Sequence, residues 1–381
     1  MSAEARRTCS PGEGARKKRH TTDELRELAK SVGGSNFHYD GRPKRSLDWA
    51  SYNEAQLHGM PDTLGLIMRF VNLASSRMPE RSRMGRRGRP PFPAGDVAKA
   101  LLLQSYFGVS DRVAAGLVYL FKEKLGIANE FSYKTIERGY DPGPVSEVLR
   151  EVFRITNEYG NAGETTLSVD GTGNPTSSKT NYESVRSEQR KKEAANSSSS
   201  SASSGSWPSS RSDFQYTVES VGVHTKLVAG FETTSDHSVG ELSMFPGVLS
   251  QTRINCPRMD AVLGDALHAT RDNCALVSQY GARPCFFPRV NATFDSHGVP
   301  SWNNMHHGFV DHPQGWLREY HMRSISETVN SVDKTRFPWK IRRRLTWRRD
   351  AAGSLRVYTY NIRRCVYMAY VQPEFLSPLR K

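Results

Sequence analysis

Three acidic residues occupy positions from which their carboxylates could act together. Asp170 ends the alternating segment TTLSVD, and Asp265 ends the apolar segment AVLGD. Both segments have the composition of short strands, and strand ends in a mixed α/β sheet are common places for a site. Glu327 lies on a later segment with helical character. Converging carboxylates repel each other unless cations lie between them, so the three acids predict a site for divalent metal ions.

The carboxylate oxygens also indicate which ions and which chemistry to expect. Hard oxygen ligands of this kind suit Mg²⁺ or Mn²⁺. Two such ions about 3.5–4 Å apart can hold the attacking and leaving oxygens of a phosphodiester. One ion would activate water or a DNA 3′-hydroxyl, and the other would stabilise the leaving group. We therefore expect two Mg²⁺ ions, with Mn²⁺ as a substitute, and no covalent link to a side chain.

The stretch YHMRSISETVNSVDK, residues 320–334, surrounds Glu327 with other polar groups. If it is one α-helix, which turns about 100° per residue, then Tyr320, Arg323, Glu327 and Lys334 share an arc of about 60°. An acid, two cations and a phenol do not form a hydrophobic core face. They favour a surface that binds an anion beside a metal, and the alternative is a solvated helix face with one Arg–Glu pair.

The overall charge of the chain favours a polyanionic partner. The 381 residues include 53 Lys and Arg against 39 Asp and Glu, which gives a net charge of +14. Nucleic acid fits this balance better than an anionic membrane surface. No apolar run approaches the roughly 18 residues of a membrane span, and the basic N-terminus has no apolar segment of a secretory signal. The five cysteines are scattered, without zinc spacing or a disulfide framework, which predicts a reduced, intracellular protein.

Two basic segments are candidates for DNA contacts. Residues 318–349 contain ten Lys or Arg against three acids. Within them, the segment KIRRRLTWRR would contact phosphates along the DNA backbone. The alternative interpretation is a run of charges that only faces solvent. The earlier segment RGRP resembles the core of an AT-hook, whose arginines reach into a narrow minor groove, although a plain basic linker that touches phosphates is the favoured interpretation. The DNA-binding candidates from these segments are Arg342, Arg343, Arg344, Arg87 and Arg89.

The elements that must position these residues divide the chain into three parts. Residues 1–45 are expected to be a basic, largely disordered extension, residues 46–160 a helical DNA-binding region, and residues 161–381 an α/β catalytic domain. A Ser-rich stretch at about 185–212 reads as a disordered insertion. Expected helices are 46–57, 62–76, 95–107, 110–125, 144–158, 235–249, 269–280 and the Glu327 helix. Expected strands are 165–170, 214–227, 227–234, 261–265 and 283–287, with a loop of about thirty residues before the Glu327 helix and a last apolar segment at 355–371.

The order of these elements is that of the ribonuclease-H-like fold, with a mixed sheet flanked by helices. Over roughly residues 85–375 the chain resembles the prokaryotic insertion-sequence transposases that use a DDE catalytic triad. One large group of them carries the signature Tyr-x2-Arg-x3-Glu-x6-Lys, which Tyr320, Arg323, Glu327 and Lys334 match without departure. The contexts SVDGTG and VLGDALH of the first two acids are also similar to that family.

The resemblance implies a function and a role for each matching position. Asp170, Asp265 and Glu327 would be the catalytic acids and metal ligands, and Tyr320, Arg323 and Lys334 would contact phosphates near the cleaved end. The protein would be a transposase that binds the terminal repeats of a mobile element, hydrolyses the 3′ end and joins it to target DNA. A homodimer on double-stranded DNA, in a prokaryotic cytoplasm and associated with the nucleoid, is expected. Alternatives are a ribonuclease-H-like nuclease without strand transfer and a noncatalytic, transposase-derived DNA-binding protein.

Two tryptophans and one histidine are secondary candidates. In relatives, a tryptophan between the second and third acids stacks on a flipped base, which makes Trp302 and Trp316 candidates for base stacking. His268 follows Asp265 by three residues and could approach a metal. The favoured interpretation of His268 is a surface or hydrogen-bonded histidine.

Overall fold

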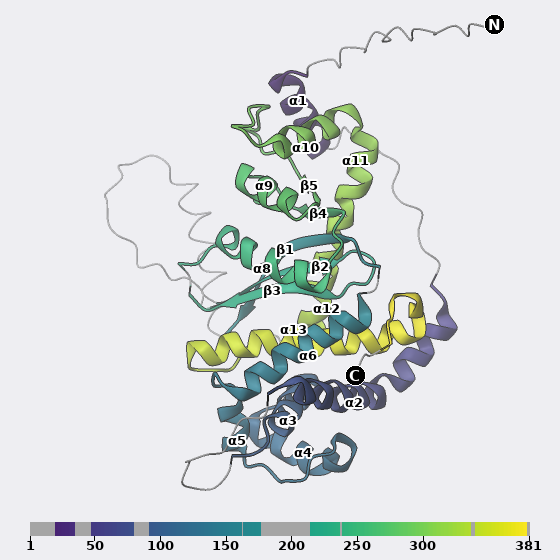
Figure 1. Cartoon of the computed structure of the whole chain (residues 1–381), viewed down its shortest axis with the longest axis vertical. Helices are drawn as coiled ribbons and strands as arrows, with labels where there is room; N and C mark the ends of the chain where they lie inside the picture. Colours follow the sequence, from purple (N-terminus) through teal and green to yellow (C-terminus); the bar gives the residue numbers. More distant parts are fainter. Residues whose placement is uncertain are drawn as a thin grey trace, which may run out of the picture.

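The computed structural model describes residues 20–34, 47–79, 91–161, 163–176, 214–236, 238–336 and 340–378. Arg87, Arg89, the Ser-rich stretch and most of the N-terminal extension lie outside the described residues. The described part is a mixed α/β structure with the sheet in its middle (Figure 1). Within it, no helix combines the length and apolar character that crossing a membrane requires.

The sheet has five strands in the order β3-β2-β1-β4-β5. The antiparallel half pairs β1 with β2 and β2 with β3, whereas β4 runs parallel to both β1 and β5. The central strand β1 is therefore flanked by one antiparallel and one parallel neighbour. The bounds are β1 Thr166–Pro175, β2 Phe214–Gly222, β3 Val228–Thr234, β4 Ala261–Gly264 and β5 Arg283–Phe286.

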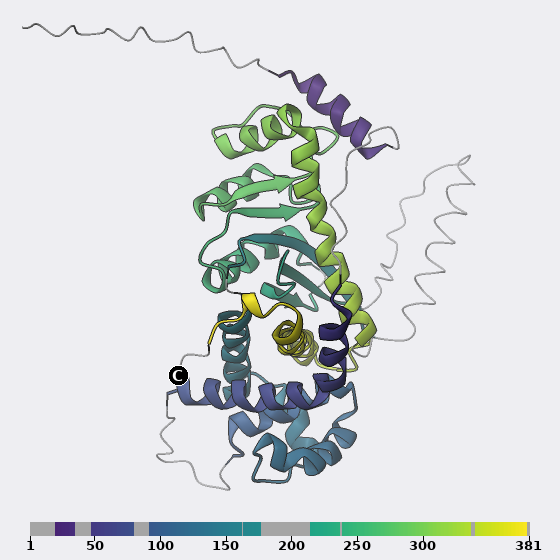
Figure 2. The same ribbon diagram turned by 90° about the vertical axis from the view of Figure 1, so that its right-hand side faces the viewer.

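Helices cover both faces of the sheet. Helices α8 (Glu241–Asn255) and α9 (Arg271–Gln279) pack against one face, where Leu167 and Val169 of β1 enter a buried apolar cluster. On the other side, the chain from α11 (Pro313–Tyr320) through the 3-10 turn η1 (His321–Arg323) to α12 (Ser324–Arg336) runs as a long rod past the sheet (Figure 2). Period-two alternation along β1 thus separates an apolar face from a face directed at the rod.

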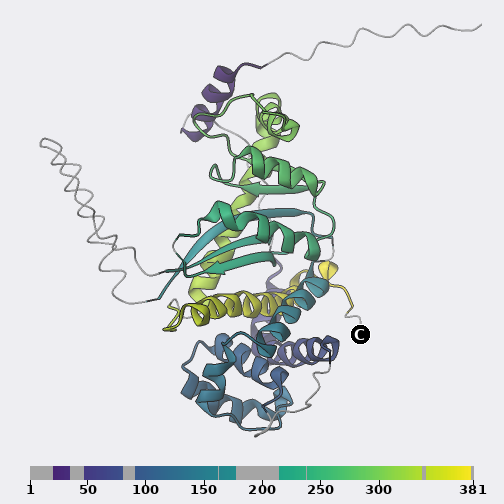
Figure 3. The same cartoon turned by 60° about the vertical axis from the view of Figure 1, so that its left-hand side comes forward.

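A helical layer lies beside the β3 edge of the sheet (Figure 3). The last helix, α13, crosses this layer and shares one apolar core with the N-terminal helices and with β2 and β3. Asn361 of α13 accepts from the backbone N–H of Val228 at 3.0 Å and donates to its carbonyl at 2.8 Å. This amide satisfies backbone groups of the edge strand that no further strand pairs with. The helices are α2 Trp49–Arg77, α3 Ala94–Phe107, α4 Asp111–Leu125, α5 Tyr133–Gly139, α6 Pro144–Gly160 and α13 Thr346–Val371.

Most expected elements are present, and several expectations about them are wrong. The strand expected to end at Asp170 continues to Pro175, so Asp170 lies inside β1 and not at its end. The two helices expected at 46–57 and 62–76 are the single helix α2, which continues through Pro61. Leu57, four residues before Pro61, is 72% exposed, so water can satisfy the backbone carbonyl that proline leaves without a donor.

The expected thirty-residue loop contains α10 (Pro300–Asp311) and α11, each with proline in its first turn. That proline fixes a helical φ and lacks only an N–H that would have no helical partner there. The last apolar segment is also longer than expected, because the basic TWRR forms the first turn of α13. At the other end of the chain, α1 (Thr22–Gly33) begins with a capping box, in which Thr21 and Glu24 are the partners.

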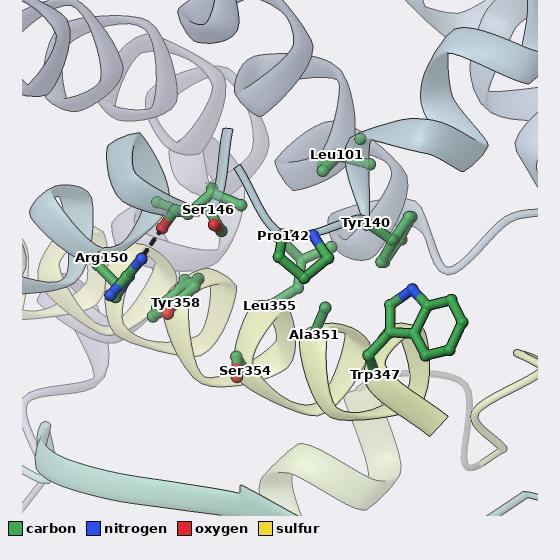
Figure 4. A pocket seen from close by; sticks show the side chains of 12 residues that line it. Leu101, Tyr140, Pro142, Ser146, Arg150, Trp347, Ala351, Ser354, Leu355 and Tyr358 are labelled. Atoms are coloured by element: carbon green, nitrogen blue, oxygen red, sulfur yellow. Dashed lines mark hydrogen bonds between the residues drawn. The ribbon is translucent and has the colours of Figure 1, made fainter. Parts of the chain in front are cut away.

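The seam between the helical layer and α13 contains a cavity of about 210 Å³. Trp347 and Tyr140 lie at one end of it, and Arg150, which donates to the carbonyl of Ser146, lies at the other (Figure 4). The indole N–H of Trp347 donates to Asp141 at 3.1 Å. The start of α13 is thus fixed to the helical layer by polar contacts around an apolar gap.

Arg343 fixes the chain just before α13 in the same way. Its guanidinium donates two hydrogen bonds to Asp111, at 2.7 and 2.8 Å, and lies 3.8 Å over the ring of Tyr140. Only 14% of its side chain is exposed. A bidentate Arg–carboxylate pair of this kind has specific geometry as well as charge. Arg343 therefore has a structural partner within the protein, whereas the basic run predicted that it would be exposed and contact phosphates.

Replacing Arg343 with alanine should lower the free energy of unfolding by about 2 kcal/mol, because a partly buried Asp111 would lose its partner. Burial works to raise the pKa of Asp111, but Arg343 and Gln104 hold it below its ordinary value. The stabilisation is therefore full above the ordinary aspartate pKa, near pH 4, and is lost as the pH falls below it. Urea denaturation at neutral and acidic pH measures both effects.

Arg342→Ala is the matched control, because that side chain is exposed. It should change the free energy of unfolding by no more than about 0.5 kcal/mol. Equal effects of the two substitutions would contradict a structural role for Arg343.

Candidate active site

The pairing of β1 with β4 brings two of the expected acids side by side. Ser168 is opposite Leu263 in the parallel register. Continued by two residues, this register brings Asp170, inside β1, level with Asp265, which directly follows β4. Neighbouring strands lie about 4.8 Å apart. Paired residues of parallel strands share a face, so both carboxylates start from the face that the rod covers.

Serine hydroxyls fix the rod to the strand beside Asp170. Ser168, fully buried, donates to the carbonyl of Arg323 at 3.1 Å, and Ser326 donates to the same carbonyl at 2.8 Å. The two hydroxyls are themselves 3.1 Å apart. The expected single helix therefore begins differently: Tyr320 ends α11, and α12 starts after the 3-10 turn. The Ser, Thr and Val residues of α12 have low helix propensity, so the contacts with the sheet help to hold this helix.

Glu327 lies in the first turn of α12, where it forms an ion pair with Arg323. The Arg323 nitrogen is 2.5 Å from the Glu327 carboxylate, and 56% of the glutamate side chain is exposed. Among the described residues, no three His, Cys, Asp or Glu side chains stand close enough together to hold a metal ion as they are. The third acid is therefore near Asp170 but is held by a cation.

Asp170 is partly buried and has other negatively charged carboxylates nearby. Burial raises the pKa of Asp170, the charge of Arg323 opposes this, and the charges of Glu241 and Glu327 raise it further. The Asn330 side chain, one turn beyond Glu327, donates to Asp170 at 3.2 Å. Carboxylates that raise one another's pKa are a donor set that a divalent cation would relieve.

The other residues of the signature lie at different depths. Tyr320 stacks on Trp316 with ring centroids 5.1 Å apart and also contacts Phe287. Burial raises the pKa of its hydroxyl, which the charge of Arg323 counteracts. Lys334 is exposed near the end of α12. The phenol and Arg323 thus border the acids, whereas Lys334 lies more than one helical turn further along the rod.

The remaining candidate residues differ in how far their side chains are exposed to solvent. Trp302 and Trp316 are 5% and 6% exposed, so their rings pack in the core and present no free face to a base in this conformation. His268 is buried, with Nε2 3.0 Å from the Glu241 carboxylate. Arg342 and Arg344 are exposed ahead of α13 and are available to a phosphate backbone.

The structure adds residues to this region that the sequence reasoning missed. Glu241 begins α8 and accepts a hydrogen bond from Tyr216 at 3.0 Å. Glu219 is opposite Asp170 in the antiparallel register of β1 and β2. Nothing in the local sequence marks Glu241, because an acid in a first helical turn is common. Asn330 could have been found, since it falls at about −80° on the helical projection, next to the Tyr320–Lys334 arc.

Comparison with known proteins shows a similarity to a curated transposase sequence. The chain is 27% identical over 290 residues to a protein named as the probable transposase for insertion sequence element ISA1214, from Archaeoglobus fulgidus. The similarity covers 74% of this chain and 78% of that protein. No family model matches the chain. No solved structure matches it either.

Replacing Arg323 with glutamine should raise the pKa of Asp170, because the largest influence that opposes burial would be removed. The carboxyl titration can be followed by ¹³C NMR of protein labelled at the aspartate side chains, with Asp170→Asn to assign the resonance. Arg336→Gln, on the exposed last turn of the same helix, removes the same charge at a distance. An Asp170 titration that is unchanged in Arg323→Gln would contradict the described electrostatics.

Proposed function

We propose that the protein is a DNA transposase of an insertion sequence, whose catalytic acids are Asp170, Asp265 and Glu327. It would bind the ends of its element, hydrolyse the phosphodiester at the 3′ end and join that end to target DNA. The observation that carries the proposal is the register of β1 and β4, which aligns Asp170 with Asp265 beneath the rod that bears Glu327. The named relative, an insertion-sequence transposase, supports the same class of activity.

The proposed fold of the catalytic part is ribonuclease-H-like. The strand order 3-2-1-4-5 supports it, with antiparallel pairing on one side of β1 and parallel pairing on the other. The acids within β1, directly after β4 and on the following rod support it as well. A dimer on DNA belongs to this proposal, because both ends of an element must be held together for joining.

The carboxylates suit divalent metal ions by their chemistry. Asp170, Asp265 and Glu327 would hold Mg²⁺ or Mn²⁺, which when bound would activate water or a 3′-hydroxyl and stabilise the leaving oxygen. Glu327 must leave its ion pair with Arg323 to contribute. A phosphate bound by Arg323 would compete for that guanidinium, which forms bidentate contacts with phosphate as readily as with carboxylate.

The chain's own residues would position the DNA around these acids. Tyr320 and Arg323 border the carboxylates, and Lys334 extends the contact along α12. Arg342 and Arg344 are exposed beyond the end of the rod. The buried serines Ser168 and Ser326 keep this DNA-facing rod in register with the strand that carries Asp170.

A cleavage and joining assay tests the function. End-labelled DNA from the flanks of the gene is mixed with the full chain and Mg²⁺ or Mn²⁺. Nicking at one flank position and joining to target DNA are expected. The cleavage rate should fall by more than about 100-fold in each of the variants Asp170→Asn, Asp265→Asn and Glu327→Gln. A loss of this size is expected of a metal ligand, because residues that only support a metal site contribute about 10- to 100-fold.

Glu319→Gln is the matched control, because its carboxylate pairs with Arg283 away from the acids. It should cleave like the wild type. Cleavage without joining would favour the nuclease alternative. DNA binding without metal-dependent cleavage, equal in all variants, would contradict the enzyme and leave a DNA-binding protein.

The exposed arginines before α13 should contribute to affinity through phosphates. Arg342→Ala together with Arg344→Ala should weaken binding to any DNA duplex and reduce the slope of log affinity against log salt by about 2, one per lost contact. Fluorescence anisotropy over a salt series measures this. Arg154→Ala, whose guanidinium pairs with Glu151 and Glu158, should leave the slope unchanged. An unchanged slope in the double variant would exclude this segment from the DNA interface.

A further inference from the structure

Glu241 approaches β1 beside Asp170 from the opposite face of the sheet. It is the first residue of α8, the helix that packs on the face away from the rod. Its carboxylate lies against Gly171, the residue directly after Asp170. A β-carbon at position 171 would be 2.7 Å from the Glu241 carboxylate and 2.7 Å from the Tyr216 hydroxyl. Only glycine at this position leaves room for the approach.

Two donors hold the Glu241 carboxylate in this place. The Tyr216 hydroxyl donates to Oε2 at 3.0 Å, and Nε2 of the buried His268 lies 3.0 Å from Oε1. The backbone N–H of His268 also lies 3.4 Å from the Asp265 carboxylate, so the turn after β4 connects Glu241 with the second acid. Each carboxylate oxygen has two lone pairs, and each of these contacts uses one.

Glu241 is not sealed in the core. Its side chain is 12% exposed and lines an open cavity of about 760 Å³ between the start of α8 and the end of the sheet. Gly173 of β1, Phe214 and Tyr216 of β2, and Leu267 after β4 line the same cavity. A ligand in this cavity therefore has access to the Glu241 carboxylate.

Glu241 also lies close enough to Asp170 for the negative charges of the two carboxylates to act on each other.

We propose that Glu241 is a fourth acid of the catalytic centre, which contributes a carboxylate oxygen to the divalent metal ions through the gap at Gly171. His268 and Tyr216 act as positioning residues that keep the carboxylate directed at the strand ends, as hydrogen-bonded partners of metal ligands commonly do. The inference rests on the proposed function. With Glu241, the centre would contain four carboxylates, three from the side of the rod and one from the side of α8.

Mn²⁺ binding to the full chain tests this role without any need for activity. Electron paramagnetic resonance of free Mn²⁺ during a titration gives the dissociation constants. Glu241→Gln and Gly171→Ala should each raise the dissociation constant of at least one ion by about 10-fold or more. Gly171→Ala displaces only the far ends of flexible side chains, so it perturbs Glu241 by a route independent of the glutamine substitution.

Each substitution has a matched control in the same part of the fold. Gly173→Ala adds a β-carbon to the same strand, 3.5 Å from the Phe214 ring, which is an ordinary contact. Glu232→Gln removes a partly buried carboxylate on β3 that lines a different cavity, together with Arg154 and Gln251. Both should leave the dissociation constants within about twofold, well below the loss expected of a ligand's partner.

Asp170→Asn and Asp265→Asn separate the two levels of the proposal. If these variants lose Mn²⁺ while Glu241→Gln and Gly171→Ala bind it like the wild type, Glu241 is not part of the centre and the proposed function stands. If the wild-type chain shows no Mn²⁺ binding that depends on Asp170, both the inference and the proposed function are overturned.

Discussion

The parallel pairing of β1 with β4 is the constraint on which the candidate site depends. It aligns Ser168 with Leu263, and the side-chain period of two then places Asp170 and Asp265 level with each other on one face. A slip by one residue would turn one carboxylate to the α8 face and its neighbours with it. The apolar residues Leu167 and Val169, fully buried under α8 and α9, prevent that slip.

Polar contacts then connect the rod to this pair of strands. The hydroxyls of Ser168 and Ser326 and the amide of Asn330 fix the start of α12 against β1, so Glu327 and Arg323 stand beside Asp170. Buried polar groups that are mutually satisfied define one arrangement, because any shift would leave a donor or acceptor unpaired. In this arrangement Arg323 holds Glu327, and the acids are close but not assembled around an ion.

Much of this could be predicted from the sequence, for identifiable reasons. Alternation and apolar composition predicted β1 and β4 and the acids beside them, although β1 continues past Asp170. The order of strands along the chain is also the expected one. Local patterns could not predict the continuation of α2 through Pro61, because tertiary packing of its later turns outweighs the lost hydrogen bond. The helices α10 and α11 were expected to be loop, and each begins at a proline, a residue that is common in loops and at the first position of a helix alike.

Contacts between distant segments account for the remaining differences. Arg343 belongs to a basic run, yet Asp111, far away in sequence, makes it a structural residue. Trp302 and Trp316 were candidates for base stacking, but their rings, on α10 and α11, are buried in the core. Glu241 has no distinguishing neighbours in sequence, and only the absent side chain of Gly171 reveals its place.

The central claim is that Asp170 and Asp265 form a divalent-metal site together with Glu327. Crystals of the full chain soaked in Mn²⁺ would test it most directly, through the anomalous scattering of the ion. The account predicts an anomalous peak between the carboxylates of Asp170 and Asp265, which disappears in Asp170→Asn. Anomalous peaks only at other surface carboxylates, or the same peak in Asp170→Asn, would contradict it.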